Sequence, residues 1–113
     1  MARALVIFGY LLGLVGGYVP AWAGQAEDPL KTALELHDGG KVKEAVAEYD
    51  KVIKANPKLA EAYFNRGNAH FDLGQNQQAV KDYSEAIRLN PKDAEAYFNR
   101  GNTYRRLKQE VAA

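Results

Sequence analysis

The sequence predicts an all-α protein, built as a short array of antiparallel helix hairpins with about two and a half repeats. The first observation is an internal duplication: residues 60–68 recur without change as residues 94–102, thirty-four positions later, which is the period of a helical-hairpin repeat. The second is that apolar residues between positions 59 and 89 fall mostly at three- and four-residue steps, the spacing of one helix face. Turn glycines and Asn-Pro pairs separate these stretches, and both end helices.

The first helix is expected to start at Asp28. An aspartate followed by Pro29 is typical of an N-cap with proline in the first helical position. The helix should end at the Asp-Gly-Gly turn of residues 38–40, which makes it shorter than its later counterparts. A second helix then holds the apolar register of the array through Ala45 and Tyr49.

The second hairpin has the clearest pattern. We expect one helix over residues 59–73, a turn at Gly74, and a second helix over residues 75–89 that ends because proline disfavours helical geometry in the residue before it. Gly67 inside the first of these helices costs about 1 kcal/mol relative to alanine. We therefore expect it to allow close helix packing opposite Ala79, with tyrosine rings filling the space above and below.

After Asp93 we expect a single helix that packs on the preceding hairpin. Its outer face would carry Arg105, Lys108 and Gln109, as a solvating cap does. The alternative is that this segment belongs to a truncated piece of a longer array.

This run of residues resembles the tetratricopeptide repeat (TPR), a family whose pattern wants aromatic, small and Leu-Gly turn residues at these offsets. The residues that carry the resemblance are Tyr63, Gly67, His70, Leu73, Gly74, Ala79, Tyr83, Ala86 and Pro91. His70 stands where the family usually has tyrosine. The resemblance implies a right-handed solenoid over residues 24–113, divided into repeat 1 (26–59), repeat 2 (60–93) and a partial repeat or capping helix (94–113).

Residues 1–23 have the features of a secretory signal peptide. Arg3 precedes an uncharged apolar run, Pro20 interrupts it, and Ala21 and Ala23 supply the small side chains that signal peptidase accepts. We expect cleavage after Ala23 and export, with a bacterial periplasm favoured as the compartment. An uncleaved membrane anchor is the alternative. Glycines in the apolar run, and the lack of a positive cluster after it, favour cleavage and no stable membrane association afterwards.

Composition narrows the class of partner. The full chain has 15 basic and 14 acidic residues, so removal of Arg3 with the signal peptide leaves the two signs balanced. A neutral chain has no overall attraction to nucleic acid, and the cluster of Arg100, Arg105, Arg106 and Lys108 is interpreted as a solvated helix face. The chain has no cysteine, which excludes disulfides and a lipoprotein anchor.

No residues suggest catalysis, a cofactor or a metal. His70 is expected to pack with a hydrogen-bond partner, and His37 to close a helix before a Gly-Gly turn. The carboxylates of Glu61, Asp72, Asp82 and Glu85 are expected on solvated helix surface beside basic residues. Neither a serine nor a threonine has a histidine in register, and no phosphate-binding loop occurs.

The TPR resemblance implies a concave groove lined by the first helix of each hairpin. Amide side chains there could bond an extended peptide backbone, and phenylalanines could act as exposed apolar anchors. The expected partner-binding residues are Glu61, Phe64, Asn65, Asn68, Phe71, Asp72, Glu95, Phe98, Asn99, Asn102, Arg105 and Arg106, with Leu30, Lys31, Leu34, His37 and Asp38 added by the first repeat. Some TPR domains hold a C-terminal carboxylate with a clamp of lysines, arginine and asparagines, but here Phe64 occupies the lysine offset.

These observations predict a protein–protein interaction module that binds a protein or peptide partner and is not an enzyme. The alternatives are a structural protein that self-associates through the open ends of the solenoid, and a fragment of a longer TPR scaffold.

Overall fold

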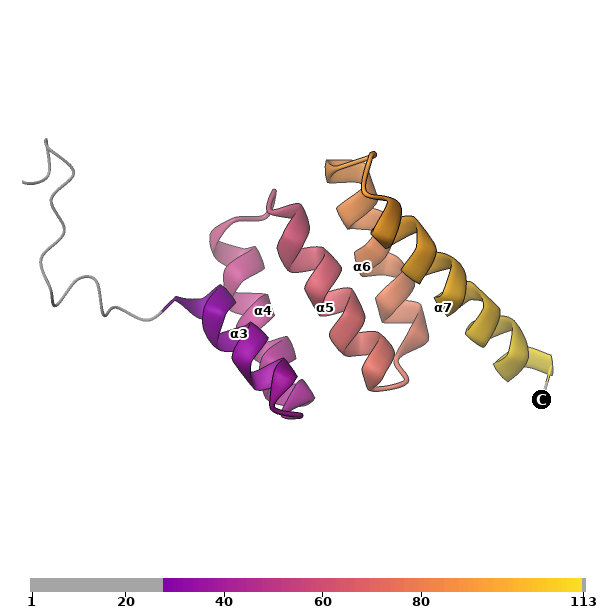
Figure 1. The fold of residues 1–113 in the computed structure, drawn as a ribbon, viewed down its shortest axis with the longest axis horizontal. Helices are drawn as coiled ribbons and strands as arrows, with labels where there is room; N and C mark the ends of the chain where they lie inside the picture. Colours follow the sequence, from indigo (N-terminus) through magenta and orange to yellow (C-terminus); the bar gives the residue numbers. More distant parts are fainter. Residues whose placement is uncertain (1–27, 113) are drawn as a thin grey trace, which may run out of the picture.

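The computed structural model describes residues 28–112, and the signal-peptide prediction for residues 1–23 lies outside that range. The described chain forms five α-helices and no strand (Figure 1). They are α3 (Pro29–Asp38), α4 (Val42–Ala55), α5 (Ala60–Asp72), α6 (Asn76–Leu89) and α7 (Ala94–Ala112). None of these helices combines the length and the apolar character that crossing a membrane requires. The all-α prediction is confirmed, and the single helix expected after Asp93 is α7.

The helix ends follow from local chemistry. The Oδ1 atom of Asp28 accepts a hydrogen bond of 3.1 Å from the backbone N–H of Leu30, so the predicted N-cap of α3 is confirmed. The turns between the helices of each hairpin use Gly40 and Gly74, whose φ angles of 85° and 75° lie in the left-handed region that favours glycine.

Gly67 permits the close approach of α5 and α6. A Cβ atom at this position would lie 2.9 Å from two ring carbons of Tyr83 and 3.3 Å from the Cβ of Asp82. Tyr83 is 1% exposed and Ala79 is fully buried, so the expected packing is confirmed for this pair. Tyr63 instead donates its hydroxyl to the carbonyl of Pro57 at 2.9 Å.

An arginine joins the hairpins and corrects one expectation. Asp82, predicted to be solvated, is only 5% exposed. Its two carboxylate oxygens accept hydrogen bonds of 2.8 Å from Arg66, which also donates to Asp50 of α4 at 2.8 Å. The bond to Asp82 is the main cause that raises the pKa of Arg66. The sequence was wrong here because a charged residue on a helix can be buried when an opposite charge lies across the interface.

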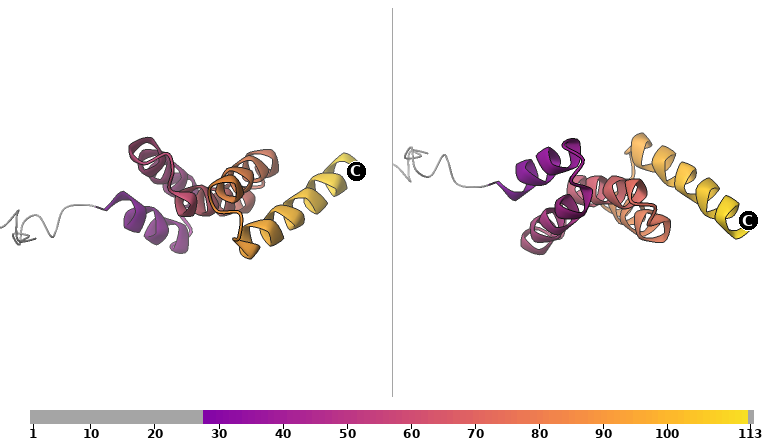
Figure 2. Two further views of the ribbon diagram at one scale, coloured as in Figure 1. Left: turned by 90° about the horizontal axis from the view of Figure 1, so that it is seen from above. Right: turned by 90° about the horizontal axis from the view of Figure 1, so that it is seen from below.

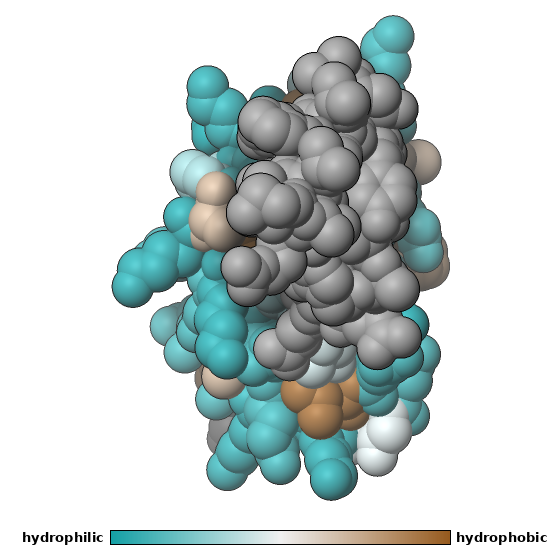
Figure 3. Space-filling model, turned by 90° about the vertical axis from the view of Figure 1, so that its left-hand side faces the viewer, coloured by the Kyte–Doolittle hydropathy of each residue, from teal (hydrophilic) through white to brown (hydrophobic). Residues whose placement is uncertain are grey.

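The hairpins stack so that equivalent helices share a side. Figure 2 shows α3 and α7 on one side of the array and α4 and α6 on the other. Helix α5 contacts all four other described helices, so it is the centre of the packing. At the end formed by α3 and α4, the described side chains in view are mainly hydrophilic (Figure 3).

Candidate functional site

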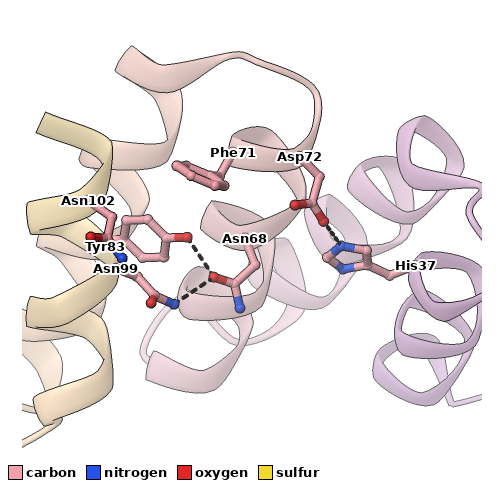
Figure 4. A pocket seen from close by; sticks show the side chains of 7 residues that line it. All are labelled: His37, Asn68, Phe71, Asp72, Tyr83, Asn99 and Asn102. Carbon is pink, nitrogen blue, oxygen red and sulfur yellow. Dashed lines mark hydrogen bonds and ion pairs between the residues drawn. The ribbon is translucent and has the colours of Figure 1, made fainter. Parts of the chain in front are cut away.

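A pocket of about 350 Å³ lies between the first helices of the hairpins (Figure 4). It is lined by residues from four helices: His37, Asn68, Phe71, Asp72, Tyr83, Asn99 and Asn102. Asn68, Phe71, Asp72, Asn99 and Asn102 were expected to line a groove, and the structure brings them together. We call this the groove pocket.

An amide network forms its centre. The Oδ1 atom of Asn68 accepts two hydrogen bonds, one of 2.5 Å from the Tyr83 hydroxyl and one of 3.1 Å from the Nδ2 of Asn99 (Figure 4). Within residues 28–112, the Nδ2 atom of Asn68 donates no hydrogen bond. The network therefore fixes the orientation of the Asn68 amide and leaves its two donors for another molecule.

Tyr83 was not expected in the site. Its ring is buried against Gly67 while its hydroxyl reaches the groove pocket. Burial raises the pKa of this hydroxyl, and the nearby charge of Asp72 raises it further. The hydroxyl therefore stays protonated and donates. Sequence analysis assigned Tyr83 to the core alone, although the tip of a buried tyrosine usually finds a polar partner.

A histidine and a carboxylate join α3 to α5 across the pocket wall. The Nε2 atom of His37 lies 2.7 Å from Oδ2 of Asp72, and its Nδ1 atom lies 3.4 Å from the Tyr49 hydroxyl. Asp72 is the one carboxylate that lines the pocket. Its side chain is 52% exposed, so it faces any ligand there with a negative charge.

Arg106 does not behave as the solvated residue that the sequence predicted. Its guanidinium carbon lies 3.5 Å from the centre of the Phe71 ring, and it donates to the Phe71 carbonyl at 2.9 Å. It is half-buried, as is Arg100, whereas Arg105 and Lys108 of the same cluster are exposed as expected. Arg106 thus secures the end of α5 to α7 and holds the Phe71 ring at the pocket edge.

The other predicted site residues lie outside this pocket. Asn65 donates to the carbonyl of Glu61 in its own helix at 3.0 Å. Phe64 is half-buried and packs on Tyr83 with ring centroids 5.9 Å apart, so its expected exposure was wrong. Phe98 is 68% exposed. Arg105 donates to Asn102.

The residues that could hold a metal do not gather. Among the described residues, no group of three or more His, Cys, Asp or Glu side chains could hold a metal ion. His70 has the hydrogen-bond partner expected of a packed histidine, since its Nδ1 atom lies 2.7 Å from Oε1 of Gln75.

The comparison with family models decides the family. A model described as "TPR repeat" matches residues 33–74 and again residues 67–108. The chain belongs to the TPR family. No protein with a curated description is similar enough in sequence to count as a relative.

Solved structures of TPR proteins share the fold. A crystal structure of MamA is 30% identical, with a TM-score of 0.69, over 71% of this chain and 47% of that chain. Another MamA structure is 30% identical, with a TM-score of 0.67, over 70% and 43%. This chain therefore spans less than half the length of MamA. The second TPR of Spaghetti (RPAP3), bound to the HSP90 peptide SRMEEVD, is 25% identical, with a TM-score of 0.70, over 72% and 75%.

Proposed function

We propose that this TPR domain binds an extended peptide segment of a partner protein in the groove pocket. The observation that carries the proposal is the amide network. Asn68 and Asn99 lie on adjacent first helices, are joined through the Asn68 oxygen, and leave the Asn68 donors facing the groove. A peptide backbone offers carbonyl acceptors to such donors. Phe71 adds an apolar edge for a side chain.

The similarity to a peptide-bound structure supports the class of partner. The second TPR of Spaghetti is bound to an HSP90 peptide, and the proposal transfers only the use of a peptide to this chain. An acidic peptide with a terminal carboxylate fits poorly here, because the exposed carboxylate of Asp72 would repel it and Phe64 replaces the clamp lysine. The proposed ligand is therefore an internal peptide segment that carries no acidic side chain opposite Asp72.

Variants of single amides test the proposal. Residues 24–113 would be screened against a displayed peptide library, and the selected peptide titrated into Asn99→Ala and Gln78→Ala. Asn99 lies in the groove, whereas Gln78 is an exposed amide on α6 outside the groove pocket. Asn68→Ala is a poorer choice because it removes the acceptor of the buried Tyr83 hydroxyl. We expect Asn99→Ala to weaken binding about tenfold, the effect of one buried hydrogen bond. Equal affinity of the two variants would argue against the groove.

We also propose that the domain is exported and that its signal peptide is removed after Ala23. The support is the sequence pattern of residues 1–23 alone. N-terminal sequencing of the protein recovered from the exported fraction should begin at Gly24. Recovery of the intact chain in the membrane fraction would instead support the anchor.

A further inference from the structure

The outer face of α7 repeats the face by which α5 holds α6. Residues 98–102 are identical with residues 64–68, and the latter make most of the polar and aromatic contacts with α6. The partner of the α5 face is therefore visible in this structure, and it defines what the α7 face is shaped to accept. We refer to Tyr97, Phe98, Arg100, Gly101 and Tyr104 as the α7 face.

On α5, one tyrosine of α6 meets three of these residues. The Tyr83 ring packs on Phe64 with centroids 5.9 Å apart and covers Gly67, where a Cβ would lie 2.9 Å away. Its hydroxyl donates to Asn68 at 2.5 Å. A flat ring between a phenylalanine and a glycine, with its hydroxyl bonded, is a complete binding site for tyrosine.

On α7, the same positions have no such partner within the described residues. A Cβ at Gly101 would have nothing within 4 Å. Phe98 is 68% exposed, Tyr97 44% and Tyr104 51%. Three large aromatic side chains around an uncovered glycine form an apolar patch that soluble proteins usually reserve for an interaction.

The charges point to the same partner. Arg66 uses one guanidinium nitrogen for Asp50 of the preceding hairpin and two others for Asp82 of its own. Arg100 makes the first type of contact, donating to Ser84 at 3.1 Å, and Ser84 stands thirty-four positions after Asp50.

The second type of contact is missing from residues 28–112. The Arg100 guanidinium lies instead over the rings of Tyr97 and Tyr104, 5.5 and 5.9 Å from their centres. A half-buried arginine without a carboxylate calls for one from the molecule that covers the face.

We propose that the α7 face docks a helix of a partner protein that presents a small residue, an aspartate and a tyrosine in the spacing of Ala79, Asp82 and Tyr83. The aspartate would pair with Arg100 and the tyrosine ring would cover Gly101. A folded second copy does not offer these groups, because Asp82 and Tyr83 are 5% and 1% exposed in their own hairpin. The surface is separate from the groove pocket, so this proposal is independent of peptide capture there.

A peptide with the sequence of residues 74–91, which contains α6, is a direct probe. It would be titrated to millimolar concentration into the full isotope-labelled chain while backbone NMR shifts are followed. We expect shifts confined to the α7 face. Gly101→Leu should weaken binding at least tenfold without loss of fold, because the new side chain meets nothing in its own chain. Glu35→Leu, an exposed position on α3, is the matched control and should bind as the wild type does.

The charge is tested on the peptide. An Asp82→Asn peptide should bind about 10- to 100-fold more weakly, the effect of hydrogen bonds to a charged group. Absence of binding, shifts centred on the groove pocket, or equal binding by Gly101→Leu would overturn the proposal. Self-association of the chain that Gly101→Leu abolishes would assign the face to a second copy and equally overturn it.

Discussion

Alanine at Gly67 and alanine at Gly101 should have opposite effects on stability, although both glycines lie in the same repeated segment. In both helices the change from glycine to alanine contributes about 1 kcal/mol of helix propensity. At Gly67 the new Cβ would come within 2.9 Å of the Tyr83 ring, and at Gly101 it would meet nothing within 4 Å. Tyr83 is 1% exposed, and overpacking of such a ring costs about 1–3 kcal/mol.

The expected free energies of unfolding follow directly. Gly101→Ala should stabilise the protein by about 1 kcal/mol, and Gly67→Ala should destabilise it by about 0–2 kcal/mol. Far-ultraviolet circular dichroism during thermal unfolding would measure the difference, which corresponds to a Tm separation of about 4–8 °C for each kcal/mol in a domain of this size. Equal stabilisation by the two variants would refute the argument, since it would mean that the Tyr83 ring does not rest on Gly67.

Three further predictions concern single side chains. Asp82→Asn should lower the free energy of unfolding by about 1.5–3 kcal/mol, because Arg66 loses its buried charged partner. Asp50→Asn, whose side chain is 57% exposed, should cost less than about 1 kcal/mol, and urea denaturation would compare the two. Burial raises the pKa of Tyr49 to about 12, followed by the charges of Asp38 and Glu61. The stability that this tyrosine contributes should be complete below pH 10. It should then fall by up to about 1.4 kcal/mol for each pH unit as the pH rises toward 12. Tyr49→Phe should remove that part of the pH profile, and an unchanged profile would contradict the assignment. Asp28→Ala should destabilise α3 by about 1 kcal/mol through loss of the N-cap, seen as faster hydrogen exchange in its first turn.

Local chemistry explains why the helices could be predicted from the sequence. A capping aspartate, turn glycines and Asn-Pro pairs act within a few residues, so their effect can be judged without the tertiary structure. The thirty-four-residue period then supplied the packing, because copies of one hairpin stack on each other in the same way. The position of Gly67 opposite Ala79 followed from that.

Contacts between helices could not be derived so easily. Asp82 was taken for a surface residue because its burial depends on Arg66, sixteen residues away on another helix. A signal was present, since Asp50 precedes Arg66 by the same sixteen residues. In the groove pocket, Asn68, Asn99 and their neighbours were predicted from the repeat, whereas Tyr83 was missed because its ring belongs to the core and only its hydroxyl to the site.

The two-sided grip of Arg66 bears on how the molecule comes apart. It ties α4 and α6, which belong to different hairpins, so neither hairpin can separate without breaking a charge-assisted bond. At the other boundary, Arg100 meets only the neutral hydroxyl of Ser84. Opening should therefore begin with α7 and reach the paired hairpins last, giving amide exchange a direction along the array. A partner helix held by Arg100 would strengthen the weakest boundary, so binding there would be felt as cooperativity throughout the chain.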